Sequence, residues 1–128
     1  MNEPESAVAP KAILLVDDQP EVREVIKVLL EIDGHRVTEA ADGVQGLELF
    51  KTGSFDLVVT DYFMPRMRGD EMAARIKELA PSQPILMITG SAEKSGGLAP
   101  AADALLCKPF TLDALRQIVA QLLSPVAA

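Results

Sequence analysis

Residues 55–65, with the sequence FDLVVTDYFMP, decide the fold of this chain. Residues 57–60 form an apolar, largely β-branched run that ends at one carboxylate, Asp61, and a turn around Pro65 follows. A continuous run of this kind predicts a strand that is buried on both faces, as in a parallel sheet. Asp61 would then lie at the carboxyl end of an inner strand, where open α/β sheets bind their ligands. An aspartate in this place also commonly begins a turn, and the stretch alone favours neither interpretation.

The rest of the chain alternates strand and helix patterns. Residues 12–16 and 85–89 are further apolar runs that predict buried strands, and residues 104–107 predict a last strand. The charged, alternating residues 35–40 predict an edge strand. Between them, apolar residues recur at helical spacing after Pro20, Asp42, Gly69 and Thr111, each suited to the start of a helix. Gly34 and Gly53 are placed to end the first two helices. The side chains predicted to face inward are Val22, Val25, Ile26, Leu29, Leu30, Val44, Leu47, Phe50, Met72, Ala73, Ile76, Leu79, Leu112, Leu115, Ile118, Val119 and Leu122.

This alternation predicts an α/β fold with right-handed crossovers. We expect a flavodoxin-like, doubly wound (βα)5 domain: a five-stranded parallel sheet in the order 2-1-3-4-5 with helices on both faces. Residues 91–100 are rich in glycine, so the fourth helix of that pattern is expected to be short or irregular. Residues 11–124 are predicted to form the domain, with tails at 1–10 and 125–128.

Composition excludes several classes of protein. The 128 residues are 48% hydrophobic and carry a net charge of −7, so we expect one globular domain that binds neither nucleic acid nor an anionic membrane surface. No apolar run approaches a membrane span, and residues 1–10 do not resemble a leader, which predicts a cytoplasmic protein if the chain is complete. Cys107, the only cysteine, is predicted to be an inert buried thiol, and His35, the only histidine, to be solvated.

Polar side chains follow the predicted strands at the points where the apolar runs end: Asp17, Asp18, Asp61, Thr89 and Lys108. In the expected strand order the first and third strands are neighbours, which brings the acidic pair beside Asp61. Crowded carboxylates repel one another, and Mg²⁺, which binds carboxylates, water and phosphate oxygens, would offset that charge. A carboxylate in such a site can act as a nucleophile and become an aspartyl phosphate. Asp61 has the central position for this role.

Four motifs now carry a resemblance to a known family. VDDQP, VVTDYFMP, MITGSA and LLCKPF, in this order and spacing, resemble the response-regulator receiver domain (CheY-like) of two-component signalling over roughly residues 11–123. The resemblance implies a phosphoacceptor domain that takes a phosphoryl group from a histidine kinase or histidine phosphotransfer protein and regulates a downstream partner that the sequence does not identify.

The resemblance also implies residue roles. Asp61 matches the phosphoacceptor, Asp18 the direct Mg²⁺ ligand and Asp17 the acid that holds the metal through water. Phe63 matches the residue whose backbone carbonyl completes the metal site. Thr89 matches the hydroxyl residue that turns toward the phosphoryl group, and Lys108 the family's lysine, before a proline bond expected to be cis.

The sequence departs from the family in two places that affect output: at Leu105, and in the segment between Thr89 and Lys108, which is rich in glycine and shorter than the family resemblance leads us to expect. Leu105 stands three residues before Lys108, where receivers usually have Tyr or Phe, so the aromatic half of the usual switch is missing. Two other classes of protein are alternatives to the receiver. A haloacid-dehalogenase phosphohydrolase would have a second aspartate where Phe63 stands, and a flavin-binding domain would not place Asp17 and Asp18 in its phosphate loop.

Overall fold

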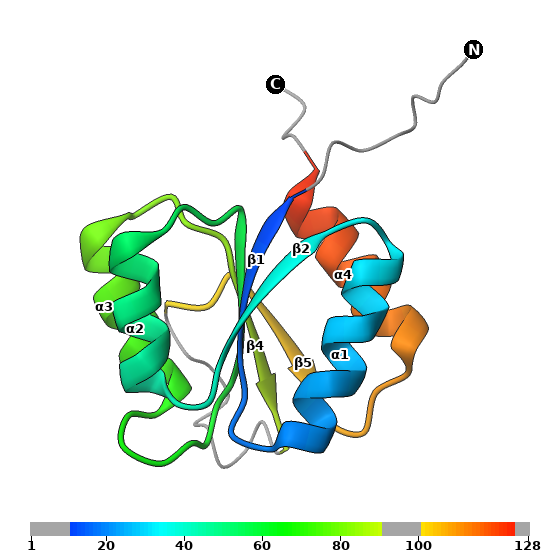
Figure 1. The fold of residues 1–128 in the computed structure, drawn as a ribbon, viewed down its shortest axis with the longest axis horizontal. Coiled ribbons are helices and arrows are strands. Elements are labelled where there is room, and N and C mark those ends of the chain that lie inside the picture. Colours follow the sequence, from blue (N-terminus) through cyan, green and yellow to red (C-terminus); the bar gives the residue numbers. More distant parts are fainter. Residues whose placement is uncertain (1–10, 91–100, 125–128) are drawn as a thin grey trace.

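A computed structural model describes residues 11–90 and 101–124 (Figure 1). Its elements, in chain order, are β1 (Ala12–Val16), α1 (Pro20–Ile32), β2 (Arg36–Ala40), α2 (Gly43–Thr52), β3 (Leu57–Asp61), α3 (Gly69–Leu79), β4 (Ile85–Thr89), β5 (Ala104–Cys107) and α4 (Leu112–Leu123). The strands form one parallel sheet in the order β2-β1-β3-β4-β5, which confirms the predicted topology. The short helix expected within residues 91–100 and both tails lie outside the described residues.

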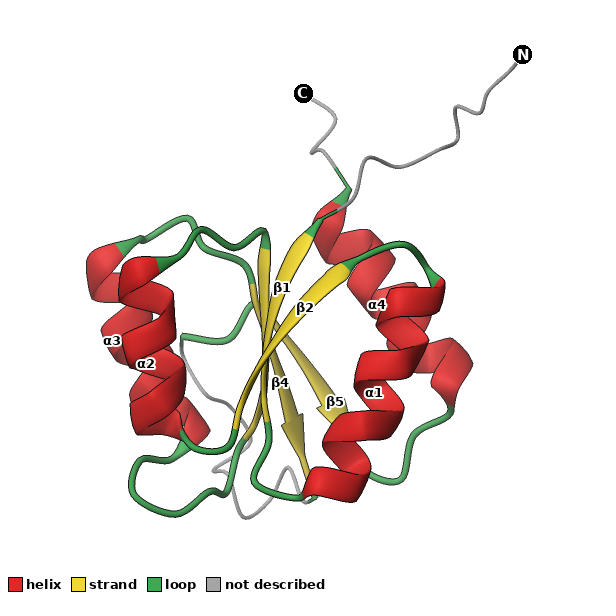
Figure 2. Cartoon of the chain, viewed as in Figure 1, coloured by secondary structure: helices red, strands yellow, loops and turns green. Residues whose placement is uncertain are grey.

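Helices cover both faces of the sheet. Figure 2 shows α2 and α3 on one side and α1 and α4 on the other. Alternate residues of the inner strands supply the two apolar cores: Leu14 and Val58 pack with α2 and α3, whereas Leu15 and Val59 pack with α1 and α4. Burial of every residue of β3 and β4 follows from this arrangement, as the continuous apolar runs predicted.

Local signals set the helix ends where the sequence predicted them. The side chain of Asp42 accepts the backbone N–H of Gln45 at the start of α2, and Thr111 accepts that of Ala114 at the start of α4. Pro20 is the first residue of α1, and Gly34 follows its end with a φ of +93°. None of the helices in residues 11–90 and 101–124 is long and apolar enough to cross a membrane.

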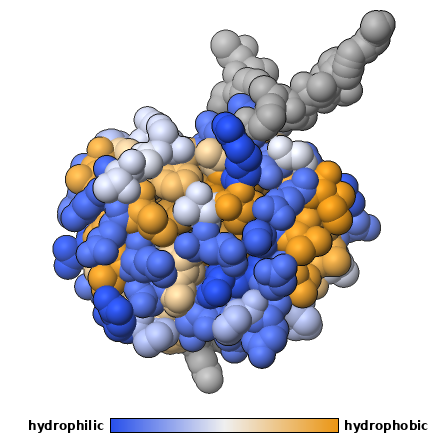
Figure 3. Space-filling model, in the orientation of Figure 1, coloured by the Kyte–Doolittle hydropathy of each residue, from blue (hydrophilic) through white to orange (hydrophobic). Residues whose placement is uncertain are grey.

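Three side chains predicted to face inward do not. Val25, Leu79 and Leu112 are 53%, 55% and 47% exposed. Leu79 and Leu112 are the last and first residues of their helices. Val25 lies on an outward stripe of α1 with Val28 and Ile32, which gives the apolar surface at the right of Figure 3. The apolar residues of α1 occupy more of the helix circumference than the face that packs on the sheet, so some of them stay exposed.

Cys107 was also predicted wrongly. Its side chain is exposed, not buried, because it ends β5, which lies at the edge of the sheet and, among the described strands, pairs with β4 alone. Residues Ala104, Leu105 and Leu106 of the same strand are only partly buried. The apolar run correctly predicted a strand here, but it did not predict that the rest of the fold covers this strand only in part.

Candidate functional site

The acids singled out in the sequence meet at the carboxyl edge of the sheet. Val16 pairs with Thr60 across β1 and β3, so the residues that follow, Asp17 and Asp61, are neighbours. One carboxylate oxygen from each of Asp17, Asp18 and Asp61 lies within 4.8 Å of the others. The convergence predicted from the strand order is therefore present.

Backbone contacts hold Asp17 in the site. Its N–H donates to the carbonyl of Ala40 at 3.1 Å, which continues the ladder between β1 and β2 by one residue. Its side-chain Oδ1 accepts the N–H of Gln19 at 2.9 Å. Only 2% of Asp17 is exposed, so its carboxylate direction is set by the protein and not by solvent.

Burial makes negative charge unfavourable in this cluster. Burial raises the pKa of Asp61, although the Lys108 ammonium acts to lower it. Burial also raises the pKa of Asp17, although the hydrogen bond from the Gln19 N–H acts to lower it. Each of these two carboxylates also feels another acid of the cluster as a like charge. A cation at this place would relieve both effects.

Lys108 and Thr89 reach the same edge from the neighbouring strands. Nζ of Lys108 lies 3.4 Å from Oδ1 of Asp61, and its backbone N–H donates to the Thr89 carbonyl at 2.8 Å. Thr89 is fully buried at the end of β4, one residue beyond the pairing of Asp61 with Ile88. The bond between Lys108 and Pro109 is cis, as expected.

Phe63 lies in the loop between β3 and α3. Its side chain is 49% exposed, and its ring packs edge-on against Tyr62 with the centroids 4.6 Å apart. Tyr62 itself is buried, and its N–H donates to the Ile88 carbonyl while its own carbonyl accepts the Gly69 N–H, each at 2.8 Å. The loop that follows Asp61 is thus attached to the sheet on one side and to α3 on the other.

Two residues at the site were missed by sequence reasoning. Arg23 donates a hydrogen bond from Nη1 to the backbone carbonyl of Asp17 at 2.7 Å. Gly69 packs so closely that an added Cβ would overlap the carbonyl of Asp61. The signals for them were slight: an arginine on the first turns of α1, and a glycine at the start of α3.

The donor set fits a hard divalent cation. Asp17 and Asp61 are buried and Asp18 is half-buried, and each offers a carboxylate oxygen, the ligand type that Mg²⁺ prefers. Softer ligands are not part of this cluster, which argues against zinc or copper.

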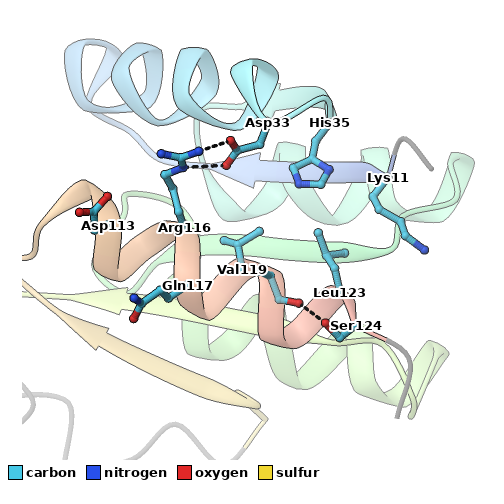
Figure 4. A pocket seen from close by; sticks show the side chains of 10 residues that line it. Lys11, Asp33, His35, Asp113, Arg116, Gln117, Val119, Leu123 and Ser124 are labelled. Carbon is cyan, nitrogen blue, oxygen red and sulfur yellow. Dashed lines mark hydrogen bonds and ion pairs between the residues drawn. The ribbon is translucent and has the colours of Figure 1, made fainter. Parts of the chain in front are cut away.

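A groove of about 770 Å³ lies at the opposite, amino-terminal edge of the sheet (Figure 4). His35, Val119 and Leu123 line it, and beside them Arg116 makes a two-point ion pair with Asp33, at 2.6 and 3.0 Å. His35 was predicted to be solvated, but it is half-buried. Its Nδ1 is enclosed, and no described residue hydrogen-bonds it. None of the five predicted polar residues lines this groove.

A doubly wound parallel sheet with clustered acids and a lysine at its carboxyl edge defines an α/β protein of the flavodoxin-like class with a candidate metal site. The response regulator receiver domain family matches residues 13–120, and the chain belongs to this family.

Named relatives fall into two groups. The chain is 39% identical over 114 residues to the sensor protein EvgS of Escherichia coli K12, an alignment that covers 87% of this chain and 10% of EvgS. It is 38% identical over 109 residues to the response regulator MprA of Mycobacterium sp. strain KMS, which covers 83% of this chain and 47% of MprA. The chain therefore spans about a tenth of one relative and about half of the other.

Solved structures share the fold. The response regulator TrrA of Thermotoga maritima, in complex with Mg²⁺-BeF, is 34% identical with a TM-score of 0.82, covering 88% of this chain and 98% of TrrA. The receiver domain of the sensor histidine kinase PA1611 of Pseudomonas aeruginosa, with magnesium coordinated in its active-site cleft, is 28% identical with a TM-score of 0.83, covering 90% and 98%.

Proposed function

We propose that this receiver domain accepts a phosphoryl group on Asp61 from a histidine kinase or histidine phosphotransfer protein in an Mg²⁺-dependent reaction, and then changes conformation to regulate a partner. We assign the function to residues 11–124. The observation that supports it best is the position of Lys108 Nζ, 3.4 Å from Asp61 Oδ1, beside carboxylates whose oxygens lie within 4.8 Å of one another.

The proposed step is a phosphoryl transfer in line. A carboxylate oxygen of Asp61 attacks the phosphorus of a phosphohistidine, the P–N bond breaks, and its electron pair stays on the imidazole nitrogen. Bound Mg²⁺ would supply charge neutralisation at the phosphoryl oxygens. Lys108 offsets the remaining negative charge, and the Thr89 hydroxyl donates a hydrogen bond to the new phosphoryl group.

The metal-holding roles follow the family resemblance. Asp18 and Asp61 would bind Mg²⁺ directly, Asp17 through water and Phe63 through its backbone carbonyl. Burial of Asp17 and the raised pKa of Asp61 support a site that is completed by a cation.

The proposed partners follow from the kinds of protein in which similar domains occur. EvgS is named a sensor protein and MprA a response regulator, so receivers like this one occur in both kinds of two-component protein. We propose that the chain acts as a signalling module that catalyses only its own phosphorylation and dephosphorylation. A haloacid-dehalogenase-type hydrolase is not favoured, because Phe63 stands where such an enzyme has its second acid.

Beryllofluoride, a phosphoryl mimic, tests this proposal with Asp61→Asn as the variant and Asp113→Asn as the control. Asp113 is exposed and lines the groove at the amino-terminal edge, so the control makes the same chemical change away from the site. Titration calorimetry in the presence of Mg²⁺ is expected to show binding to the wild type and Asp113→Asn, and none to Asp61→Asn. Absence of binding to the wild type, or binding to Asp61→Asn, would overturn it. Turnover of small phosphate esters would instead indicate a hydrolase.

A further inference from the structure

Arg23 joins the metal-site loop to two secondary-structure elements. It lies on the first turns of α1, where its own N–H donates to the Gln19 carbonyl at 2.9 Å. Its guanidinium donates from Nη1 to the Asp17 carbonyl at 2.7 Å and from Nε to Oε1 of Glu39, on β2, at 3.0 Å. One planar group therefore links α1, the end of β1 and β2.

The hydrogen bond to the Asp17 carbonyl acts on Asp18. That carbonyl belongs to the peptide unit that also contains the Asp18 N–H, and a peptide unit is planar and rigid. Fixing the carbonyl direction fixes the plane, and with it the position of the Asp18 Cα, from which the Asp18 side chain leaves the backbone. The Asp17 N–H is held separately by Ala40, so both ends of Asp17 are anchored.

The burial and the contacts of the Arg23 side chain fit a role in holding the site loop better than they fit a surface charge. Its side chain is 19% exposed, against 29% for Lys27, which also pairs with Glu39, at 3.6 Å. A guanidinium presents several donors in a fixed plane, so it can bond a carbonyl and a carboxylate at once. Lys27 has no hydrogen bond to the Asp17–Gln19 loop among the described contacts.

We infer that Arg23 is a positioning residue of the metal site, which holds the peptide unit between Asp17 and Asp18 so that the Asp18 carboxylate faces Asp61. This inference rests on the proposed function, because it assumes that these acids bind Mg²⁺. Groups that orient metal ligands from outside the coordination sphere are worth about 10- to 100-fold in metal affinity.

A competing effect has the opposite sign. Arg23 is a cation near a cation site, so its charge alone would weaken Mg²⁺ binding. Glu39 lies against both Arg23 and Lys27 and offsets much of either charge. If repulsion dominated, removing Arg23 would tighten Mg²⁺ binding; if positioning dominates, removal weakens it.

The test compares Arg23→Met with Lys27→Met by titration calorimetry with MgCl₂. Both changes remove one positive charge from α1 beside the same Glu39, but only Arg23 touches the site loop. We expect Kd for Mg²⁺ to rise about tenfold in Arg23→Met and to stay at the wild-type value in Lys27→Met. Arg23→Lys is expected to bind weakly as well, since an ammonium does not reproduce the planar two-point contact.

Melting temperatures in EDTA separate positioning from general stability. A structural role alone would lower the melting temperature of Arg23→Met and leave its Kd equal to that of Lys27→Met, which would overturn the inference. Tighter binding in Arg23→Met, or full affinity in Arg23→Lys, would overturn it too. If Arg23→Met does not fold, Arg23→Lys carries the test, because it keeps the positive charge and loses the planar two-point contact, and it is expected to raise Kd several-fold. A wild type that binds no Mg²⁺ would refute the proposed function itself.

Discussion

Asp61 is a carboxylate held where its own charge is unfavourable. It is 8% exposed, its pKa is raised by burial, and Asp18 adds a like charge, while Lys108 compensates only in part. Such a group destabilises the metal-free fold at neutral pH. Strain of this kind is common where a residue is kept for reactivity.

Replacing Asp61 with Asn should therefore stabilise the protein without metal. In EDTA at pH 7 we expect Asp61→Asn to melt about 3 °C above the wild type, because it removes the buried charge. Saturating Mg²⁺ should reverse this order, since it stabilises the wild type more than the variant. Thermal scans of both proteins in both buffers, with Asp113→Asn as the control, provide the measurement. A variant that melts below the wild type in EDTA would contradict the account.

His35 gives the protein a pH dependence of a different origin. Desolvation by burial lowers its pKa below 6.5, and the Lys11 charge adds to this, while Asp33 and Asp56 act in the opposite direction. In the unfolded chain the histidine binds a proton near pH 6.5, whereas in the folded protein it does so only at lower pH. The unfolded state then binds more protons, so stability is lost as the pH falls through this window.

The prediction is a slope that depends on His35. Between pH 7 and the lowered pKa, the free energy of unfolding should fall by at most about 1.4 kcal/mol per pH unit. The difference between wild type and His35→Gln, measured by urea unfolding, isolates this effect from the titration of Asp17 and Asp61. A difference that does not vary between pH 7 and 5 would contradict it.

The connection between β3 and α3 is the element that fixes the site most tightly. Gly69 begins α3, donates its N–H to the Tyr62 carbonyl at 2.8 Å, and lies against the carbonyl of Asp61. The start of the helix is thus packed directly on the backbone of Asp61.

Gly69→Ala tests this packing. Alanine gains about 1 kcal/mol over glycine in a helix, but its Cβ would overlap a backbone carbonyl that cannot move without displacing Asp61. Overpacking costs about 1–3 kcal/mol, so we expect a net loss of up to about 2 kcal/mol and weaker Mg²⁺ binding. Gly90→Ala is the control, since its Cβ would meet no described atom within 4 Å. Equal stability of the two variants by urea unfolding would contradict the prediction.

The elements also show what the sequence could predict. Strand ends and caps were predictable, because a polar residue after an apolar run, as at Asp61, or a cap such as Asp42, is a local signal. Val25 and Cys107 were not, because their exposure depends on how far neighbouring elements extend. Arg23 was missed because its partner is a backbone carbonyl, which no pattern of side chains reveals.

At the scale of the whole molecule, the two edges of the sheet differ in chemistry. The carboxyl edge gathers the acids and Lys108, whereas the groove beside Arg116 and His35 lies at the amino edge. The parallel topology brings the acids and Lys108, which are distant in sequence, to the carboxyl edge. The same topology explains why the acids and the lysine of the sequence motifs lie close together.

Phosphoryl transfer to Asp61 is the central claim, and mass spectrometry tests it most directly. The protein is incubated with a phosphorylated histidine phosphotransfer protein or acetyl phosphate, with MgCl₂ or with EDTA, and its intact mass and peptide map are recorded. We predict one added phosphoryl group on Asp61 in the wild type with magnesium, and none in EDTA or in Asp61→Asn. A phosphoryl group on another residue, or equal labelling of Asp61→Asn, would contradict the account.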